Sequence, residues 1–132
     1  MNEDQAVQKI KNFFNENGGQ FIYENKARNI VHCNAHEDGV NVDCLANRPF
    51  LPWGVFWQAV HVIIRNGGSA RKGSAQQCKL GDVDLPFNSV EGGVANVIYG
   101  KKRGDWVFQR ISPIAHILSA SGYVLMDQAS WN

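Results

Sequence analysis

The chain has 132 residues, of which 44% are hydrophobic and 19% charged, and its formal net charge is +1. This is the size of one ordinary domain with enough apolar residues for a core, which excludes a disordered acidic tail or basic arm. The charge is uneven, because residues 1–47 carry a net charge of −3 and residues 48–132 carry +4. This asymmetry either reflects scattered surface charge or favours an anionic partner for the second half.

The composition also bears on the compartment of the protein. No stretch approaches the roughly 18 apolar residues of a membrane span, and charges interrupt the first twenty residues, so we expect no signal peptide. The three cysteines, Cys33, Cys44 and Cys78, lack a CxxC spacing. These features predict a cytoplasmic protein with reduced thiols and no membrane contact.

The first half of the chain predicts a helix followed by a β-meander. Apolar residues recur at helical spacing over residues 2–16, and Gly18-Gly19 ends the pattern. We expect three strands, over residues 20–24, 30–36 and 40–46. A two-residue Asp38-Gly39 turn would place Cys33 opposite Cys44 and bring the apolar faces of the second and third strands together.

The second half predicts mainly helices. Arg48-Pro49-Phe50-Leu51-Pro52 is expected to break the meander and lead into a helix over residues 53–65. Residues 69–88 are ambiguous, with a candidate short strand at 76–80. Further elements are a short helix capped by Ser89 over residues 89–98, a helix capped by Asp105 with Val107, Phe108 and Ile111 inward, and a strand over Tyr123–Met126. At Pro113 the helix that begins at Asp105 either kinks or ends, and in the second case a new helix capped by Ser112 follows.

The order of these elements and the ending ISPIAHILSASGYVLMD resemble a winged helix-turn-helix DNA-binding domain, over at most residues 53–128. This resemblance implies that the final helix enters the DNA major groove. We therefore predict an α+β fold, in which an N-terminal helix and a small antiparallel β-meander pack on a C-terminal, winged-helix-like helical unit. Residues 1–132 are expected to form a single compact domain, which divides, if at all, into 1–48 and 49–132.

The candidate binding residues lie in this second half. We expect phosphate contacts from the cations Lys101, Lys102, Arg103 and Arg110, with Arg71 and Lys72 as further backbone contacts. Gln109 and His116 are candidates for contacts with base edges or phosphates. The alternative is that Lys101–Arg103 forms a solvated turn and that Arg110 pairs with Asp105. We predict a small, bacterial-type, non-enzymatic DNA-binding protein that needs no cofactor and whose first half binds a protein partner or a second copy.

Three other readings remain open. Trp53, Phe56 and Trp57 are close enough on one helix to form a protein-binding face. The triplet Gln77-Cys78-Lys79, together with nearby carboxylates at Asp43, Asp82, Asp84 and Glu91, is compatible with a magnesium-dependent nuclease. Zinc would suit the types of side chain found at His32, Cys33, His36, Asp43 and Cys44. However, strand alternation places the histidines and the cysteines on opposite faces, so we assign no metal site.

Overall fold

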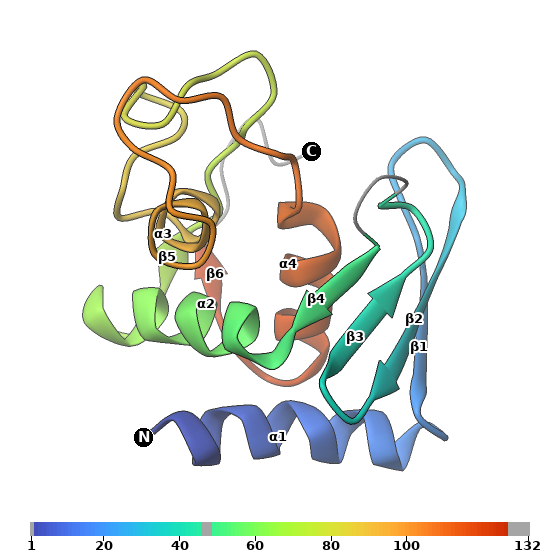
Figure 1. Cartoon of the computed structure of the whole chain (residues 1–132). Coiled ribbons are helices and arrows are strands. Elements are labelled where there is room, and N and C mark those ends of the chain that lie inside the picture. The colour runs from blue at the N-terminus through green and yellow to red at the C-terminus, as the bar shows by residue number, and fades with distance from the viewer. Residues whose placement is uncertain (1, 46–48, 127–132) are drawn as a thin grey trace.

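A computed structural model describes residues 2–45 and 49–126, which form an α+β fold of four helices and two sheets (Figure 1). The helices are α1 (Glu3–Glu16), α2 (Trp53–Arg65), α3 (Val90–Val97) and α4 (Ile111–Ala120). The strands are β1 (Gln20–Glu24), β2 (Ile30–His36), β3 (Gly39–Val42), β4 (Phe50–Pro52), β5 (Ala70–Arg71) and β6 (Leu125–Met126). Within the described ranges, no helix is both long enough and apolar enough to cross a bilayer.

Helix α1 begins with a capping box, as the polar residues around its start allow. The side-chain oxygen of Asn2 accepts the backbone N–H of Gln5 at 2.9 Å, and the side-chain oxygen of Gln5 accepts the N–H of Asn2 at 3.0 Å. One face of the helix, which includes Ile10 and Phe14, is fully buried. The predicted helix over residues 2–16 is therefore confirmed.

The main sheet is antiparallel in the order β1-β2-β3-β4, and the predicted register of its central hairpin is wrong by two residues. Cys33 lies opposite Val42 instead of Cys44, because the turn is formed by Glu37-Asp38 and Gly39 already pairs with His36. A Cβ atom at Gly39 would collide with the carbonyl oxygen of Leu51, so the close strand pairing requires glycine there. Because the shift is an even number of residues, the predicted apolar faces still coincide.

The segment after the meander leads into a helix over 53–65 as predicted, but its residues 50–52 also form a fourth strand that the pattern did not predict. β4 pairs with β3 through Val40 opposite Leu51, and Leu51 is fully buried. Its proline is tolerated because β4 is an edge strand of the four-stranded sheet. The third strand ends at Val42, and residue 46 of the predicted strand lies outside the described residues.

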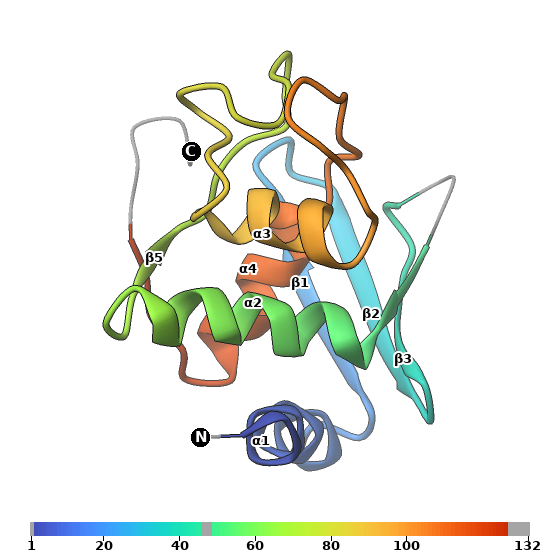
Figure 2. The same cartoon turned by 60° about the vertical axis from the view of Figure 1, so that its left-hand side comes forward.

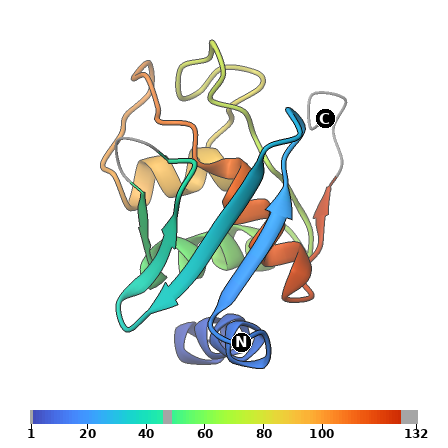
Figure 3. The same cartoon turned by 90° about the vertical axis from the view of Figure 1, so that its right-hand side faces the viewer.

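Three helices, α2, α3 and α4, lie behind one face of the sheet, and α1 lies across its lower end (Figure 3). The side chains buried between these layers come from both halves of the chain. Phe14, Val31 and Val40 pack in the same core as Phe56 and Ile117. Figure 3 shows that no described element covers the opposite face of the sheet.

Helix α3 packs so closely on its surroundings that it needs its two glycines. Its Ser89 cap forms as predicted, because the hydroxyl accepts the N–H of Gly92 at 3.1 Å. A Cβ atom at Gly92 would collide with the carbonyl oxygen of Pro86, and one at Gly93 would lie 2.6 Å from a methyl group of Val62 on α2. Close approach therefore outweighs the low helix propensity of glycine here.

The predicted helix beginning at Asp105 does not form. Residues 105–110 are not helical, and the Asp105 carboxylate accepts the N–H of Lys102 at 2.8 Å, so it closes a turn instead of capping a helix. Helix α4 begins at Ile111, close to the new start that Pro113 suggested. The strand predicted over Tyr123–Met126 is shorter, and β6 pairs in parallel with β5.

Candidate nucleic-acid interface

Two long loops, residues 72–89 and 98–110, lie together at the end of the molecule opposite α1 (Figures 1 and 2). Backbone hydrogen bonds join them, since Leu80 N–H donates to the Asp105 carbonyl at 2.9 Å and Gly104 N–H donates to the Leu80 carbonyl at 2.8 Å. Lys79 and Trp106 also form an isolated antiparallel bridge. The loops enclose a small core of their own, built from Ala75, Leu80 and Leu85 with Cys78, Phe87 and Val107 packed against it.

The chain from Trp106 to Phe108 alternates between solvent and this small core. Trp106 and Phe108 are 62% and 46% exposed, whereas the intervening Val107 packs against the small core. Such alternation is typical of extended backbone, in which successive side chains point to opposite sides. The segment therefore presents two large aromatic side chains to solvent.

Each of three cations in these loops lies close to an aromatic ring. The Lys79 Nζ atom is 5.1 Å from the centre of the Trp106 ring, and the Lys101 Nζ atom is 5.5 Å from that of Phe108. The Arg103 guanidinium carbon is 4.9 Å from the centre of Phe87. We define the basic aromatic surface as Lys79, Phe87, Lys101, Lys102, Arg103, Trp106 and Phe108.

Glycine gives Arg103 its place on this surface. A Cβ atom at Gly81 would lie 2.6 Å from a terminal nitrogen of Arg103, and Gly81 has a backbone φ of +101°. That φ value is rare for residues with a side chain, so the turn selects glycine for conformation as well as for space. Gly81 thus lets the Arg103 side chain cross from one loop to the other.

The cations of the basic aromatic surface are not neutralised by ion pairs. Among the described residues, Lys79, Lys101, Lys102 and Arg103 form no salt bridge. The nearby carboxylates of Asp82 and Asp105 instead accept the backbone N–H groups of Lys79 and Lys102, each at 2.8 Å. The two loops also carry the exposed carboxylates of Asp82, Asp84 and Asp105. The cations are thus free of direct ion pairs and can turn toward an anionic ligand, but the net charge of the loop end is small.

The structure separates the eight predicted contact residues into two groups. Lys102, Arg103 and Gln109 are exposed at the loop end, and Lys101 is half-buried beside them. Arg110 and Lys72 are only 4% and 6% exposed, so their side chains do not reach the surface in this conformation. His116 is half-buried on α4, and Arg71 is half-buried on β5.

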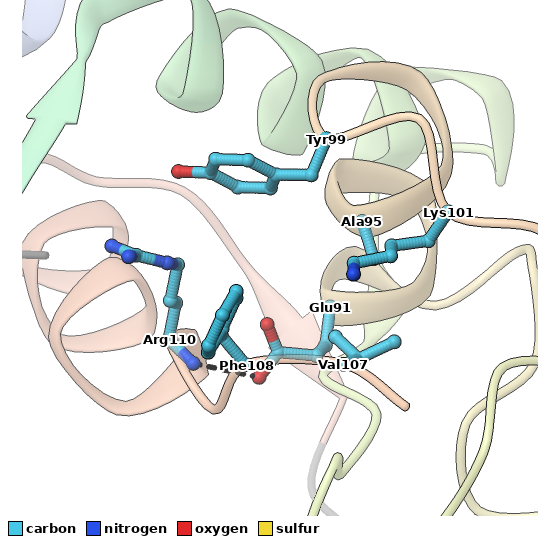
Figure 4. Close-up of a pocket in the computed structure, with 7 residues that line it drawn as sticks. All are labelled: Glu91, Ala95, Tyr99, Lys101, Val107, Phe108 and Arg110. Atoms are coloured by element: carbon cyan, nitrogen blue, oxygen red, sulfur yellow. Dashed lines mark hydrogen bonds between the residues drawn. The ribbon is translucent and has the colours of Figure 1, made fainter. Parts of the chain in front are cut away.

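A buried carboxylate lies beside Arg110 (Figure 4). Glu91 of α3 is 1% exposed, and its Oε2 atom accepts the backbone N–H groups of Arg110 at 3.1 Å and Ile111 at 2.9 Å. Burial raises the pKa of Glu91 to about 7, while the two N–H groups and the Arg110 charge act in the opposite direction. Glu91 therefore caps the start of α4 from a different helix.

Arg110 is held by aromatic rings instead of by the predicted pairing with Asp105. Its guanidinium carbon lies 5.2 Å from the centre of the Tyr99 ring and 5.9 Å from that of Phe108. Figure 4 shows these side chains around a cavity with Glu91 and Lys101. The cavity measures about 10 Å³, enough for one water molecule at most, so it offers no room for a larger ligand.

His116 faces the sheet. Its ring stacks on Tyr23 with 4.0 Å between ring centres and 17° between planes. Burial lowers the pKa of His116, and the nearby positive charge of Lys72 lowers it further. Both effects favour a neutral imidazole within the interior.

Helix α4, which the winged-helix resemblance expects to enter DNA, is largely enclosed between the sheet and α2 (Figures 1 and 3). Its five buried positions run from Pro113 to Leu118, and the exposed ones are Ser112, Ser119 and Ala120. The helix therefore presents few side chains that could reach base edges.

The residues of the other hypotheses are buried, half-buried or engaged in local contacts. Phe56 is fully buried, and Trp53 and Trp57 are half-buried. The Trp53 indole N–H donates to the Glu37 carbonyl, and the Trp57 ring stacks on His61. Glu91 is engaged in the α4 cap. Asp43 is on the sheet, where its carboxylate lies 3.0 Å from His32 Nδ1, and the bond from the His32 backbone lowers the pKa of Asp43.

No family model, curated protein or solved structure matches the chain. The sequence does not mark Trp106 and Phe108 as ligand-facing, because the spacing of Val107, Phe108 and Ile111 predicts a helix with Phe108 inward. The sequence pattern that could have indicated their exposure is the i, i+2 spacing of Trp106 and Phe108 directly after the turn at Gly104, because this spacing also fits an extended segment.

Proposed function

We propose that this protein binds nucleic acid through the basic aromatic surface. The observation that carries the proposal is a group of four cations on two joined loops, none of them in an ion pair within the described residues. Three of them lie over aromatic rings, and two of those rings, Trp106 and Phe108, are exposed. Lysine and arginine side chains gain affinity for phosphates by releasing condensed counterions. The aromatic rings add faces that can contact sugars or bases.

The proposal keeps the DNA-binding prediction but moves the contact from the last helix to the loop end. Lys101, Lys102 and Arg103 remain the proposed phosphate contacts, and Lys79 joins them from the other loop. Gln109 is exposed at the edge of this surface and remains a candidate for a polar contact. Arg110, which is buried over Tyr99, is assigned to positioning α4 instead of to contacting the ligand.

The test is a fluorescence anisotropy titration of labelled 30-nucleotide oligonucleotides, single-stranded and duplex, at two salt concentrations. We expect dissociation constants on the order of 10⁻⁶–10⁻⁴ M that weaken steeply as salt increases. The double variant Lys101→Gln, Arg103→Gln should bind more weakly and lower the salt slope by about 1 to 2, since each lost phosphate contact removes roughly one unit.

The matched control is Lys9→Gln with Lys11→Gln. These two lysines also lie over aromatic rings, Tyr123 and Trp53, but they are on α1 at the other end of the molecule (Figure 1). The control removes the same charge and the same kind of contact, so it should leave affinity and salt slope unchanged. Equal loss in the control and the test variant would contradict a localised interface.

A further inference from the structure

The basic aromatic surface also indicates which form of nucleic acid it fits. We infer, on the basis of the proposed function, that its ligand is single-stranded nucleic acid whose unpaired bases stack on Trp106 and Phe108. Three features of the described structure carry this inference: the exposure of the rings, the placement of the cations, and the enclosure of α4.

The two rings reach solvent, and each also has a cation over it: Lys79 over Trp106, and both Lys101 and Arg110 over Phe108. Trp106 and Phe108 lie two residues apart in an extended segment and are 62% and 46% exposed. In a duplex the faces of the bases are covered by their neighbours, so an exposed ring can stack only on bases that are unpaired or unstacked. Indole is the larger of the two rings and is the more exposed, so Trp106 is the principal platform.

The cations lie next to the rings instead of forming a separate basic patch. Lys79 is 5.1 Å from the Trp106 ring and Lys101 is 5.5 Å from the Phe108 ring. The Lys79–Trp106 backbone bridge and the bonds between Leu80, Gly104 and Asp105 fix this spacing. A base stacked on a ring therefore brings its own phosphate near a lysine, which is the combination that sequence-tolerant single-strand binding uses.

Helices α2, α3 and α4 offer a poor fit to a duplex groove. Major-groove reading uses an exposed helix or a two-stranded ribbon, and α4 exposes only Ser112, Ser119 and Ala120. The helices α2 and α3 carry no exposed basic residue except Arg65, in the last turn of α2. A duplex can meet the surface only through its phosphates, whereas a single strand can use both phosphates and bases.

The experiment compares dT30 and rU30 single strands with a hairpin duplex of equal phosphate number, at one fixed salt concentration. The intact protein should bind the single strands about tenfold or more tightly than the duplex. Trp106→Ala should weaken single-strand binding by about 5- to 100-fold, which is the range for loss of one stacked base, and leave duplex binding and the salt slope unchanged. Trp106→Phe should retain most of the affinity.

Tryptophan fluorescence gives a second readout at the same residue. Stacking on dT30 should quench the emission of the intact protein, and Trp106→Phe should lose that quenching while it still binds. If duplex and single strands bound with equal affinity and Trp106→Ala did not change either affinity, the single-strand inference would be overturned and the proposed function would stand. Absence of binding to every oligonucleotide at low salt would overturn the proposed function itself.

Discussion

Glu91 shows how much of this fold depends on one buried residue. Its position in the first turn of α3 is favourable for an acidic side chain, and its carboxylate also satisfies two N–H groups at the start of α4. Neither Arg110 nor Ser112 caps α4 with its own side chain. The carboxylate is fully buried, so the same residue that joins the two helices also carries a cost of desolvation.

Stability should depend on pH through Glu91. Its pKa rises from the ordinary value of 4.5 to about 7 on folding, so between these pH values the folded protein binds more protons than the unfolded chain. The free energy of unfolding must then decrease as pH rises across this window. We expect the intact protein to lose about 2–3 kcal/mol more than Glu91→Gln between pH 5 and pH 8.

Urea denaturation of both proteins at the two pH values measures this difference. Glutamine keeps an oxygen that can accept the Arg110 and Ile111 N–H groups, so the variant should fold. The comparison also removes the contribution of His116, whose lowered pKa acts in the opposite direction and is common to both proteins. Parallel stability profiles for the two proteins would show that Glu91 does not titrate in this range.

At the scale of elements, close backbone approach decides where glycine is required. Gly92 in α3 and Gly54 in α2 are both glycines within helices, but the atoms around them differ. A Cβ atom at Gly92 would meet the carbonyl oxygen of Pro86, while one at Gly54 would meet only the tip of Ile98, at 4.0 Å.

Alanine substitution should therefore have opposite effects at the two positions. We expect Gly92→Ala to lower the free energy of unfolding by about 1–3 kcal/mol through overpacking, in spite of its gain in helix propensity. Gly54→Ala should raise the free energy of unfolding by about 0.5–1 kcal/mol, because only the propensity changes. Thermal and urea denaturation of the two variants measures these changes. If both substitutions changed the free energy of unfolding in the same direction, the close packing of α3 would be contradicted.

The segment from Asp105 to Arg110 shows why spacing alone did not assign its element. Val107, Phe108 and Ile111 fit one face of a helix, but the same stretch also fits alternation with Trp106 and Phe108 outward. The choice is made by bonds to the other loop, since Leu80 donates to the Asp105 carbonyl and Lys79 bridges to Trp106. The partner residues lie more than twenty positions away in sequence.

For the whole molecule, the main core is shared between the two halves of the chain. Phe14 packs edge-on against Trp53 with 6.5 Å between ring centres, and Tyr23 stacks on His116. The buried face of the meander therefore has its partners on α2 and α4. Either half alone would expose the side chains that it buries against the other half.

We expect the separate fragments 1–48 and 49–132 to be unfolded when each is produced alone. Each lacks the apolar partners that would offset the entropy of ordering its chain. The measurement is the amide proton dispersion in a two-dimensional ¹H–¹⁵N spectrum of each fragment, with the full chain as control. Native-like dispersion from one fragment would show that this half forms an independent domain.

The sequence by itself determined the local elements. Periodic apolar residues, the Ser89 cap and the glycine stops predicted α1, α2 and α3. The strand signals predicted β1 and β2, and alternation predicted the buried face of β2. These signals arise from residues within one or two turns of each other, so they can be seen without the fold.

Only the tertiary structure decided the rest. It paired β4 with the meander, enclosed α4, buried Arg110 and Lys72, and brought Lys79 to Trp106. Each of these outcomes depends on contacts between residues far apart in the chain, such as Glu91 and Arg110, which are 19 positions apart. The sequence does not show whether a lysine or arginine is buried by distant residues or surrounded by solvent. The exposed cations could therefore be distinguished from the buried ones only in the folded molecule.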